Sequence, residues 1–252
     1  MKSIWLISIP FLLFLTSCKE KGCTDEFAYN FNLEAEKDDG SCLYKDSLTF
    51  NFRLTYNSQA IYQYDVFENN GKNFRIERYS AYISNISLND SEIKDVHLYN
   101  IENSSTESFS TSLDDINYST LSFGLGLNEE MNNSDPSSFS IDHPLSITQN
   151  TYWQMEPASY IFVKLELKVD SLGGYNFNYP LTYHLAHNDL YREINFPIQL
   201  DSENRFHEIT LNLAIDQILN NIDINIDLPH SSNSSPLANS LIDNMVDAFY
   251  IE

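Results

Sequence analysis

Histidine and tryptophan are the residues in this sequence whose chemistry is scarce enough to be informative. Imidazole is a common ligand for copper and zinc, and it also transfers protons near neutral pH. His184 and His187 are three residues apart, so in a regular strand they would face opposite sides and could share a metal only across a turn or bulge. From spacing alone, each histidine is most simply explained as structural or surface. The six histidines are His97, His143, His184, His187, His207 and His230.

Sequence signatures of common enzymes are missing. The segment 123–126, F-G-L-G, contains G-x-G but lacks the third glycine and the lysine of phosphate-binding loops. The chain has no G-x-S-x-G nucleophile motif and no H-E-x-x-H zinc motif. The sequence therefore offers none of these catalytic signatures, and its scarce histidines and tryptophans are the more informative residues.

The charge of the chain limits its partners. It has 14 Lys and Arg residues against 36 Asp and Glu residues, which gives a formal net charge of −22. Binding to a nucleic acid backbone requires clustered basic residues, so no nucleic acid partner is expected. An electrostatic attraction to anionic lipid is equally disfavoured.

The N-terminus is typical of an exported protein. Lys2 is followed by an apolar run, 4–15, that is too short to span a bilayer. The residues Leu15-Thr16-Ser17-Cys18 resemble the lipobox of bacterial lipoproteins, which predicts that 1–17 is a signal peptide and that Cys18 is lipidated. An ordinary signal peptide is the alternative. If Cys18 is lipidated, the lipid alone would hold the protein at the membrane, because no second apolar run approaches membrane-spanning length.

The charged residues after Cys18 indicate where the lipoprotein would reside. Lys19-Glu20-Lys21 resembles the surface-export signals of Bacteroidetes lipoproteins. This resemblance predicts an outer-membrane lipoprotein, and it leaves open whether the protein faces the periplasm or the cell surface.

Residues 18–45 are expected to form a small acidic stalk module. In an oxidising compartment, Cys23 and Cys42 are predicted to form one disulfide. The pattern G-C-T-D, then A-x-N-F-N, then D-D-G-S-C resembles a module of secreted Bacteroidetes proteins. Its aspartates could bind calcium, but clustered aspartates are more often turn-formers, so calcium is not the favoured interpretation.

Residues 46–252 are predicted to form the main domain, an all-β, antiparallel, immunoglobulin-like sandwich with a short C-terminal helix. Apolar residues alternate with polar ones along 48–56, 161–169 and 209–215, and 222–228 is a further candidate strand. Ser235 is a candidate helix N-cap, followed by Pro236. The helix would present one apolar face, made of Leu237, Leu241, Met245 and Phe249.

A series of short motifs between about residues 47 and 250 resembles the MbnP-like family of copper-binding proteins. No single motif is specific, and the resemblance rests on their order and spacing. The motifs are R-Y-S-A-Y-I-S-N-I at 78–86, F-G-L-G at 123–126 followed by Asn132, H-P-L at 143–145, Y-W-Q-M at 152–155 followed by Tyr160, K-L-E at 164–166, Y-H-L at 183–185, and His230 followed by Leu237, Ala238 and 244–249.

The resemblance implies a β-sandwich that binds copper and is not an enzyme. It also implies a partner, a di-haem cytochrome peroxidase-like protein that oxidises a tryptophan of the binding protein to kynurenine. Carried over by position, the metal-site candidates are His143, His184, His230 and Trp153, with Trp153 as the oxidised residue. The motifs do not themselves say which histidines bind the metal.

Three positions depart from the family pattern. Met155 replaces a second tryptophan, Ser159 a glycine before Tyr160, and Ala186 the glycine of H-L-G. Met155 could supply a thioether to Cu(I), but packing in the core is the simpler expectation. If the partner requires both tryptophans, this chain has lost the modification.

A metal-free function is the alternative. A lipid-anchored sandwich with many tyrosines would also suit a surface module that recognises a glycan, a peptide or a neighbouring protein. The copper hypothesis requires histidines to converge near Trp153, whereas a recognition module would leave them scattered.

Overall fold

The computed structural model describes residues 19–114, 116–154, 157–201, 203–224 and 235–252. The predicted signal peptide, 1–17, and Cys18 lie outside the described residues. The chain divides into two compact units between Lys45 and Asp46. No helix in the described ranges is long and apolar enough to cross a membrane.

The small N-terminal unit is held together by its disulfide and by turns. Cys23 and Cys42 are bonded, as predicted, with their Cα atoms 4.7 Å apart. Strand β1 (Lys21–Gly22) pairs in parallel with β2 (Lys37–Asp38). The carboxylates of Asp25 and Asp39 each accept a hydrogen bond from the backbone N–H two residues ahead, at 2.9 and 3.0 Å. These aspartates therefore act as turn-formers in this unit.

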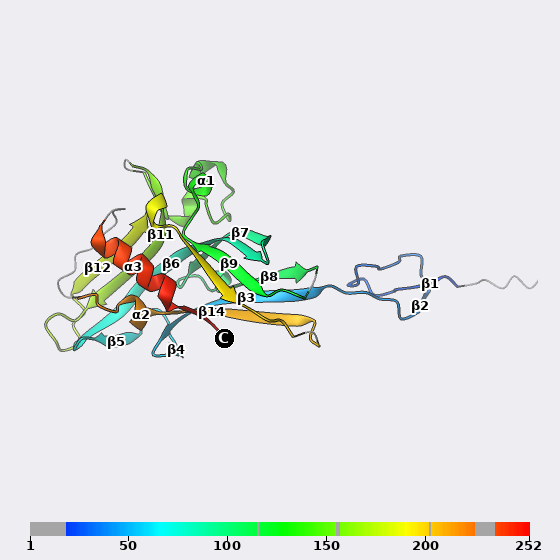
Figure 1. The fold of residues 1–252 in the computed structure, drawn as a ribbon, viewed down its shortest axis with the longest axis horizontal. Helices are drawn as coiled ribbons and strands as arrows, with labels where there is room; N and C mark the ends of the chain where they lie inside the picture. Colours follow the sequence, from blue (N-terminus) through cyan, green and yellow to red (C-terminus); the bar gives the residue numbers. More distant parts are fainter. Residues whose placement is uncertain (1–18, 115, 155–156, 202, 225–234) are drawn as a thin grey trace, which may run out of the picture. The chain divides into compact units, whose positions relative to one another are not determined.

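The main domain consists of two β-sheets with short helices (Figure 1). The larger sheet contains β5 (Val66–Asn69), β6 (Lys72–Leu88), β7 (Ser91–Asn100), β9 (Thr120–Leu125), β10 (Tyr152–Trp153), β11 (Ser159–Val169), β12 (Tyr179–Ala186) and β13 (Arg192–Pro197). The smaller sheet contains β3 (Asp46–Tyr56), β4 (Gln59–Ala60), β8 (Ser108–Leu113), β14 (Phe206–Ala214) and β15 (Phe249–Ile251). The helices are α1 (Glu129–Asn132), α2 (Ile215–Ile218) and α3 (Pro236–Ala248), and the 3-10 turns are η1 (Ser104–Thr106), η2 (Pro136–Ser138), η3 (Ile147–Gln149) and η4 (Asn188–Leu190).

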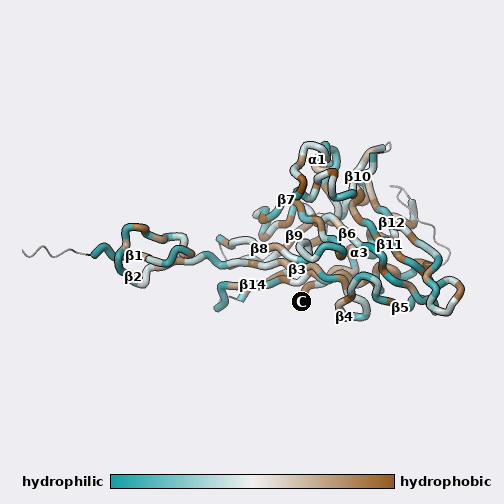
Figure 2. Tube along the Cα trace, turned by 180° about the vertical axis from the view of Figure 1, so that it is seen from behind, coloured by the Kyte–Doolittle hydropathy of each residue, from teal (hydrophilic) through white to brown (hydrophobic). Residues whose placement is uncertain are grey.

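The two sheets form the predicted all-β sandwich. Hydrophobic and hydrophilic residues alternate along its strands (Figure 2). In β11, for example, Leu165 and Leu167 are buried in the core while Lys164 and Glu166 point away from it. Burying one face of each sheet against the other removes apolar surface from water, which is the main driving force for folding.

One strand pairing differs from the antiparallel expectation. β14 runs parallel to β3 along 206–214 and 47–55. The intervening chain passes through the larger sheet before it returns, so no tight hairpin forces the two strands to be antiparallel. The remaining pairings within the main domain, among the residues that the structure describes, are antiparallel.

The C-terminal helix begins as predicted. The Ser235 hydroxyl accepts a hydrogen bond from the Ala238 N–H at 3.3 Å, and Pro236 is the first helical residue. Leu241 and Met245 are fully buried on one face of α3, which packs against β12, β13 and β14.

The fourth predicted strand, 222–228, is not seen in its described part. Ile222 and Ile224 are buried but lie in the turn that follows α2, and 225–228 lie outside the described residues. Ile215 begins α2 instead of extending β14. The alternating apolar residues Ile222 and Ile224 therefore pack in the core without forming a β-strand.

The F-G-L-G motif serves backbone packing. Gly126 has φ +94°, a conformation that residues with a Cβ rarely adopt, and a Cβ at this position would overlap the ring of Phe162. A Cβ at Gly124 would likewise overlap the ring of Tyr191. Both glycines are therefore required by close contacts with aromatic rings.

We predict that Gly126→Ala lowers the free energy of unfolding by about 2–4 kcal/mol, because it combines backbone strain with overpacking. Gly71→Ala is the matched control: Gly71 also has a positive φ, +76°, but nothing lies within 4 Å of its added Cβ. Urea denaturation of both variants separates the two causes. Equal losses for the two variants would contradict the proposed overlap with Phe162.

His97 is a core residue rather than a ligand. Its ring stacks on Phe52 at 4.5 Å between centroids, and its Nε2 lies 2.8 Å from the carbonyl oxygen of Thr106. Burial lowers the pKa of His97 to about 4. The imidazole is therefore neutral in the folded protein at neutral pH.

We predict that His97 makes stability depend on pH. The unfolded state, with a pKa near 6.5, binds a proton that the folded state does not, so stability falls as pH decreases from 6.5 towards 4. Between pH 7 and 5 the loss from this residue is about 2 kcal/mol. His97→Phe, which keeps the aromatic stack, should lose less stability over this range than the natural protein in urea titrations. An identical loss in both proteins would disprove the role of His97.

Candidate metal-binding region around Trp153

Trp153 lies in a short hairpin at the end of the larger sheet. β10 pairs antiparallel with the start of β11, and Trp153 is opposite Ser159. The neighbouring residue, Tyr152, packs edge-to-face against the ring of Tyr160 at 4.9 Å between centroids. This contact and the two-residue pairing position the half-buried indole.

The segment that leads into β10 is anchored by two buried tyrosines. The Tyr82 hydroxyl donates to the carbonyl oxygen of Pro144 at 2.9 Å and lies 2.6 Å from the Thr151 hydroxyl. The Tyr160 hydroxyl donates to the carbonyl oxygen of Leu145 at 2.8 Å. Burial raises the pKa of both tyrosines, so both hydroxyls remain protonated donors.

Ser159 connects the elements around Trp153. Its buried hydroxyl donates to Asn132 Oδ1 at 3.0 Å and accepts from the His187 N–H at 3.0 Å. Asn132 also accepts from the Tyr160 N–H and donates to Asn188 Oδ1 at 2.7 Å. Ser159 thus links β11, α1 and the end of β12.

His187 is the histidine that the structure brings to Trp153. The two ring centroids are 6.5 Å apart. β12 ends at Ala186 and His187 has φ +79°, so the chain turns at this point and the alternation of strand faces ends. The spacing of His184 and His187 predicts that they act together only across a turn. It does not select His187 as the partner of Trp153, because a left-handed backbone is not readable from the residue type.

His184 is oriented by a hydrogen bond to the carboxylate of Glu166. Its Nε2 lies 3.0 Å from Glu166 Oε1, and Arg78 Nη1 donates to Glu166 Oε2 at 3.0 Å. Burial lowers the pKa of His184 more than the bond to Glu166 raises it, so the ring is neutral at pH 7. Burial raises the pKa of Glu166, but the bonds from His184 and Arg78 outweigh it and the net pKa is lowered.

These protonation states determine which nitrogen of His184 is free. A neutral ring that donates Nε2–H to an ionised carboxylate carries its lone pair on Nδ1. A histidine oriented by a carboxylate in this way is typical of metal-ligating histidines. Glu166 belongs to the K-L-E motif at 164–166, but the motif by itself does not identify Glu166 as the partner of His184.

His143 is engaged differently. Its Nδ1 accepts a hydrogen bond from the Leu145 N–H at 3.1 Å, and its ring stacks on Phe139 at 4.4 Å between centroids. A neutral imidazole that accepts at Nδ1 carries its proton on Nε2. His143 would have to give up this bond, or its remaining proton, before either nitrogen could bind a metal.

His230 and Met155 lie outside the described residues. His207 is buried in β14. Among the residues that the structure describes, no group of three or more His, Cys, Asp and Glu side chains is placed to hold a metal ion. The described residues therefore offer two imidazoles near the end of β12, and further donors would have to come from elsewhere in the chain.

The main domain is similar to known proteins in sequence pattern and in fold. The model of the MbnP family matches residues 45–236. Among solved structures, the chain is similar to MbnP from Methylosinus trichosporium, with a TM-score of 0.59 and 10% sequence identity, over 83% of this chain and 99% of that chain. At this identity the structural likeness shows a shared fold.

No curated protein matches the chain. The family match covers most of the main domain, including β10, β12 and the strands that support them. The chain therefore belongs to the MbnP family.

Proposed function

We propose that this protein is a copper-binding lipoprotein that acts outside the cytoplasm. The observation that carries the proposal is the contact between the rings of His187 and Trp153 in a chain of the MbnP family. His184, three residues earlier in the chain, is oriented by the carboxylate of Glu166. Imidazole nitrogens are suitable ligands for copper in both oxidation states. Copper would be the cargo that the protein binds and hands on.

The described residues supply part of a set of donor atoms suited to copper. His184 offers Nδ1, because its Nε2–H is directed at Glu166. No hydrogen bond to the His187 ring is found among the described residues, so both of its nitrogens are available in one tautomer or the other. Two imidazoles can satisfy Cu(I), which accepts low coordination numbers, and His230 and Met155 are the remaining donor candidates. His143 is the weaker candidate because of its bond to Leu145.

Oxidation of Trp153 to kynurenine is part of the proposal. Opening the C2–C3 bond of indole adds two oxygen atoms to the residue, and hydrolysis then releases formate. Two molecules of peroxide, used by a di-haem peroxidase-like partner, would supply the oxygen atoms and leave as two molecules of water. Trp153 is half-buried at the end of a two-residue strand, where its ring is partly accessible to such a partner.

The proposed location follows from the N-terminal residues. Cys18 would carry the lipid after removal of 1–17, and the disulfide-bonded unit would separate the lipid from the main domain. The protein would then reside at the outer membrane, on its periplasmic or cell-surface face.

We predict that His184→Ala and His187→Ala each weaken copper binding by about tenfold or more, because each removes a ligand. His143→Asn is the matched control, since an asparagine side chain can still accept from the Leu145 N–H; its affinity should stay within about twofold. Competition titrations with a Cu(I) chelator measure all three. A loss in His143→Asn without a loss in His187→Ala would move the site to His143.

Glu166→Gln tests the orientation of His184 without removing a ligand. An amide accepts a weaker hydrogen bond than a carboxylate and can also turn its NH₂ towards the imidazole. We expect copper affinity to fall by about 10-fold. Glu208→Gln, an exposed carboxylate on β14, is the control. Unchanged affinity in Glu166→Gln would mean that His184 does not bind copper.

Protein from its native host tests the tryptophan chemistry. Peptide mass spectrometry should show the 151–160 segment with the mass of kynurenine at Trp153, together with stoichiometric copper. If copper is bound but Trp153 is unmodified, the proposal of copper binding stands and the proposal of an oxidising partner is refuted. Absence of copper after loading and dialysis would refute the proposed function as a whole.

A further inference from the structure

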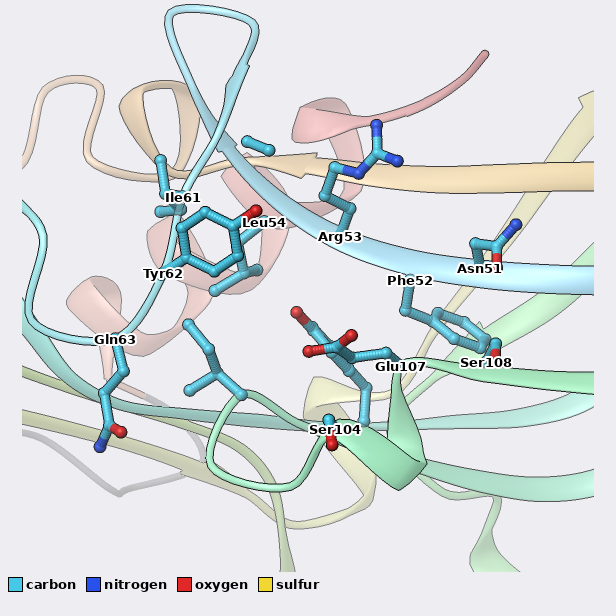
Figure 3. A pocket seen from close by; sticks show the side chains of 13 residues that line it. Asn51, Phe52, Arg53, Leu54, Ile61, Tyr62, Gln63, Ser104, Glu107 and Ser108 are labelled. Carbon is cyan, nitrogen blue, oxygen red and sulfur yellow. The ribbon is translucent and has the colours of Figure 1, made fainter.

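A cavity opens at the edge of the smaller sheet, in a gap between two of its strands. Along β3, the pairing with β8 ends at Asn51 and the pairing with β4 begins at Thr55, so the short segment 52–54 faces neither strand. This segment forms one wall of a cavity of about 510 Å³ (Figure 3). This volume lies within the range of about 300–1,000 Å³ that is usual for pockets that bind small molecules.

The backbone of β3 is already largely hydrogen-bonded at the gap. The Phe52 N–H donates to the carbonyl oxygen of Glu107 at 2.8 Å, and the Ile61 N–H donates to the carbonyl oxygen of Leu54 at 3.1 Å. The Leu54 N–H is bonded to the buried hydroxyl of Tyr99. An extended peptide that joins a sheet needs a row of free backbone groups, so the cavity does not favour addition of a peptide strand.

An exposed tyrosine forms one side of the cavity mouth. Tyr62 is 71% exposed, yet its backbone is held: its N–H donates to Asp65 Oδ2 at 2.8 Å, and its carbonyl oxygen accepts from the Asp65 N–H at 3.2 Å. A large aromatic ring exposed to water on a hydrogen-bonded turn can serve as a platform for the apolar face of a ligand.

Side chains that donate hydrogen bonds and side chains that accept them line the cavity together with this ring. Figure 3 shows Tyr62 and Gln63 on one side of the cavity and Phe52, Glu107 and Ser108 on the other. The Gln63 amide donates to the carbonyl oxygen of Glu77 at 2.7 Å, which leaves its side-chain oxygen as an acceptor. Glu107 adds a carboxylate, and Ser108 adds a hydroxyl that can donate or accept.

The charges at the cavity disfavour a strongly anionic ligand. Arg53 and Glu107 carry opposite charges, and Arg53 is also 3.5 Å from Glu252 at the rim. A polyanion would meet Glu107 and the acidic surface of a chain with a net charge of −22. With an exposed aromatic ring beside polar donors and acceptors, the cavity suits a neutral molecule with many hydroxyl groups and one apolar face.

We propose that this cavity binds a neutral oligosaccharide, with one sugar ring stacked on Tyr62 and its hydroxyls bonded to Glu107 and Gln63. A pyranose combines an apolar C–H face with hydroxyls that donate and accept, and the cavity provides the complement of both. The described residues of the cavity are shared neither with the contact between Trp153 and His187 nor with the pair formed by His184 and Glu166. The inference is therefore independent of copper binding.

The test uses the full-length chain in detergent and a panel of neutral oligosaccharides of glucose, mannose, galactose and N-acetylglucosamine. Calorimetry and ligand-observed NMR should detect binding of at least one of them. Tyr62→Ala and Glu107→Gln should each weaken that binding by about tenfold or more. Both positions are exposed, so thermal unfolding should show that the variants remain folded.

Tyr175→Ala is the matched control, because Tyr175 is also 71% exposed and does not line the cavity. Its affinity should be unchanged. Failure of every neutral oligosaccharide to bind would overturn the proposal. Binding that survives in either cavity variant, or that is lost equally in Tyr175→Ala, would overturn it as well.

Discussion

The architecture of the main domain depends on one long strand, β6. It pairs with β5 and β7 on one side and with β11 and β9 on the other, so most of the larger sheet is attached to it. Residues on its inner face, such as Phe74 and Ile76, are fully buried in the core between the sheets. A strand that must satisfy four neighbours and bury one face can adopt only one register, because a slip of one residue would expose its core residues.

Buried polar contacts extend this register to the Trp153 region. Tyr82 of β6 and Tyr160 of β11 use their hydroxyls to hold the segment before β10, and Ser159 holds His187 and Asn132. A buried hydroxyl without a partner would be costly, so these bonds select one arrangement of the covering segment. The position of Trp153 beside His187 is therefore a consequence of sheet pairing and of polar groups that must be satisfied.

The two proposed sites use different parts of the same sandwich. The copper site is built at the end of β10 and β12, where strands finish and the chain turns, whereas the cavity occupies a gap in the pairing of β3. Both lie where the regular ladder is interrupted. Regular strands supply rigidity, and their interruptions supply side chains with unused hydrogen-bonding capacity.

The all-β class, the C-terminal helix with its Ser235 cap, the disulfide and the family could all be predicted from the sequence. These features depend on local periodicity, capping chemistry, cysteine count and ordered motifs, all of which are properties of the chain read in order. Three other features emerge only in the folded molecule: the parallel pairing of β14 with β3, the turn that brings His187 to Trp153, and the bond from His184 to Glu166. Each of them joins residues whose relation depends on three-dimensional register and backbone conformation, which residue type and spacing alone do not specify.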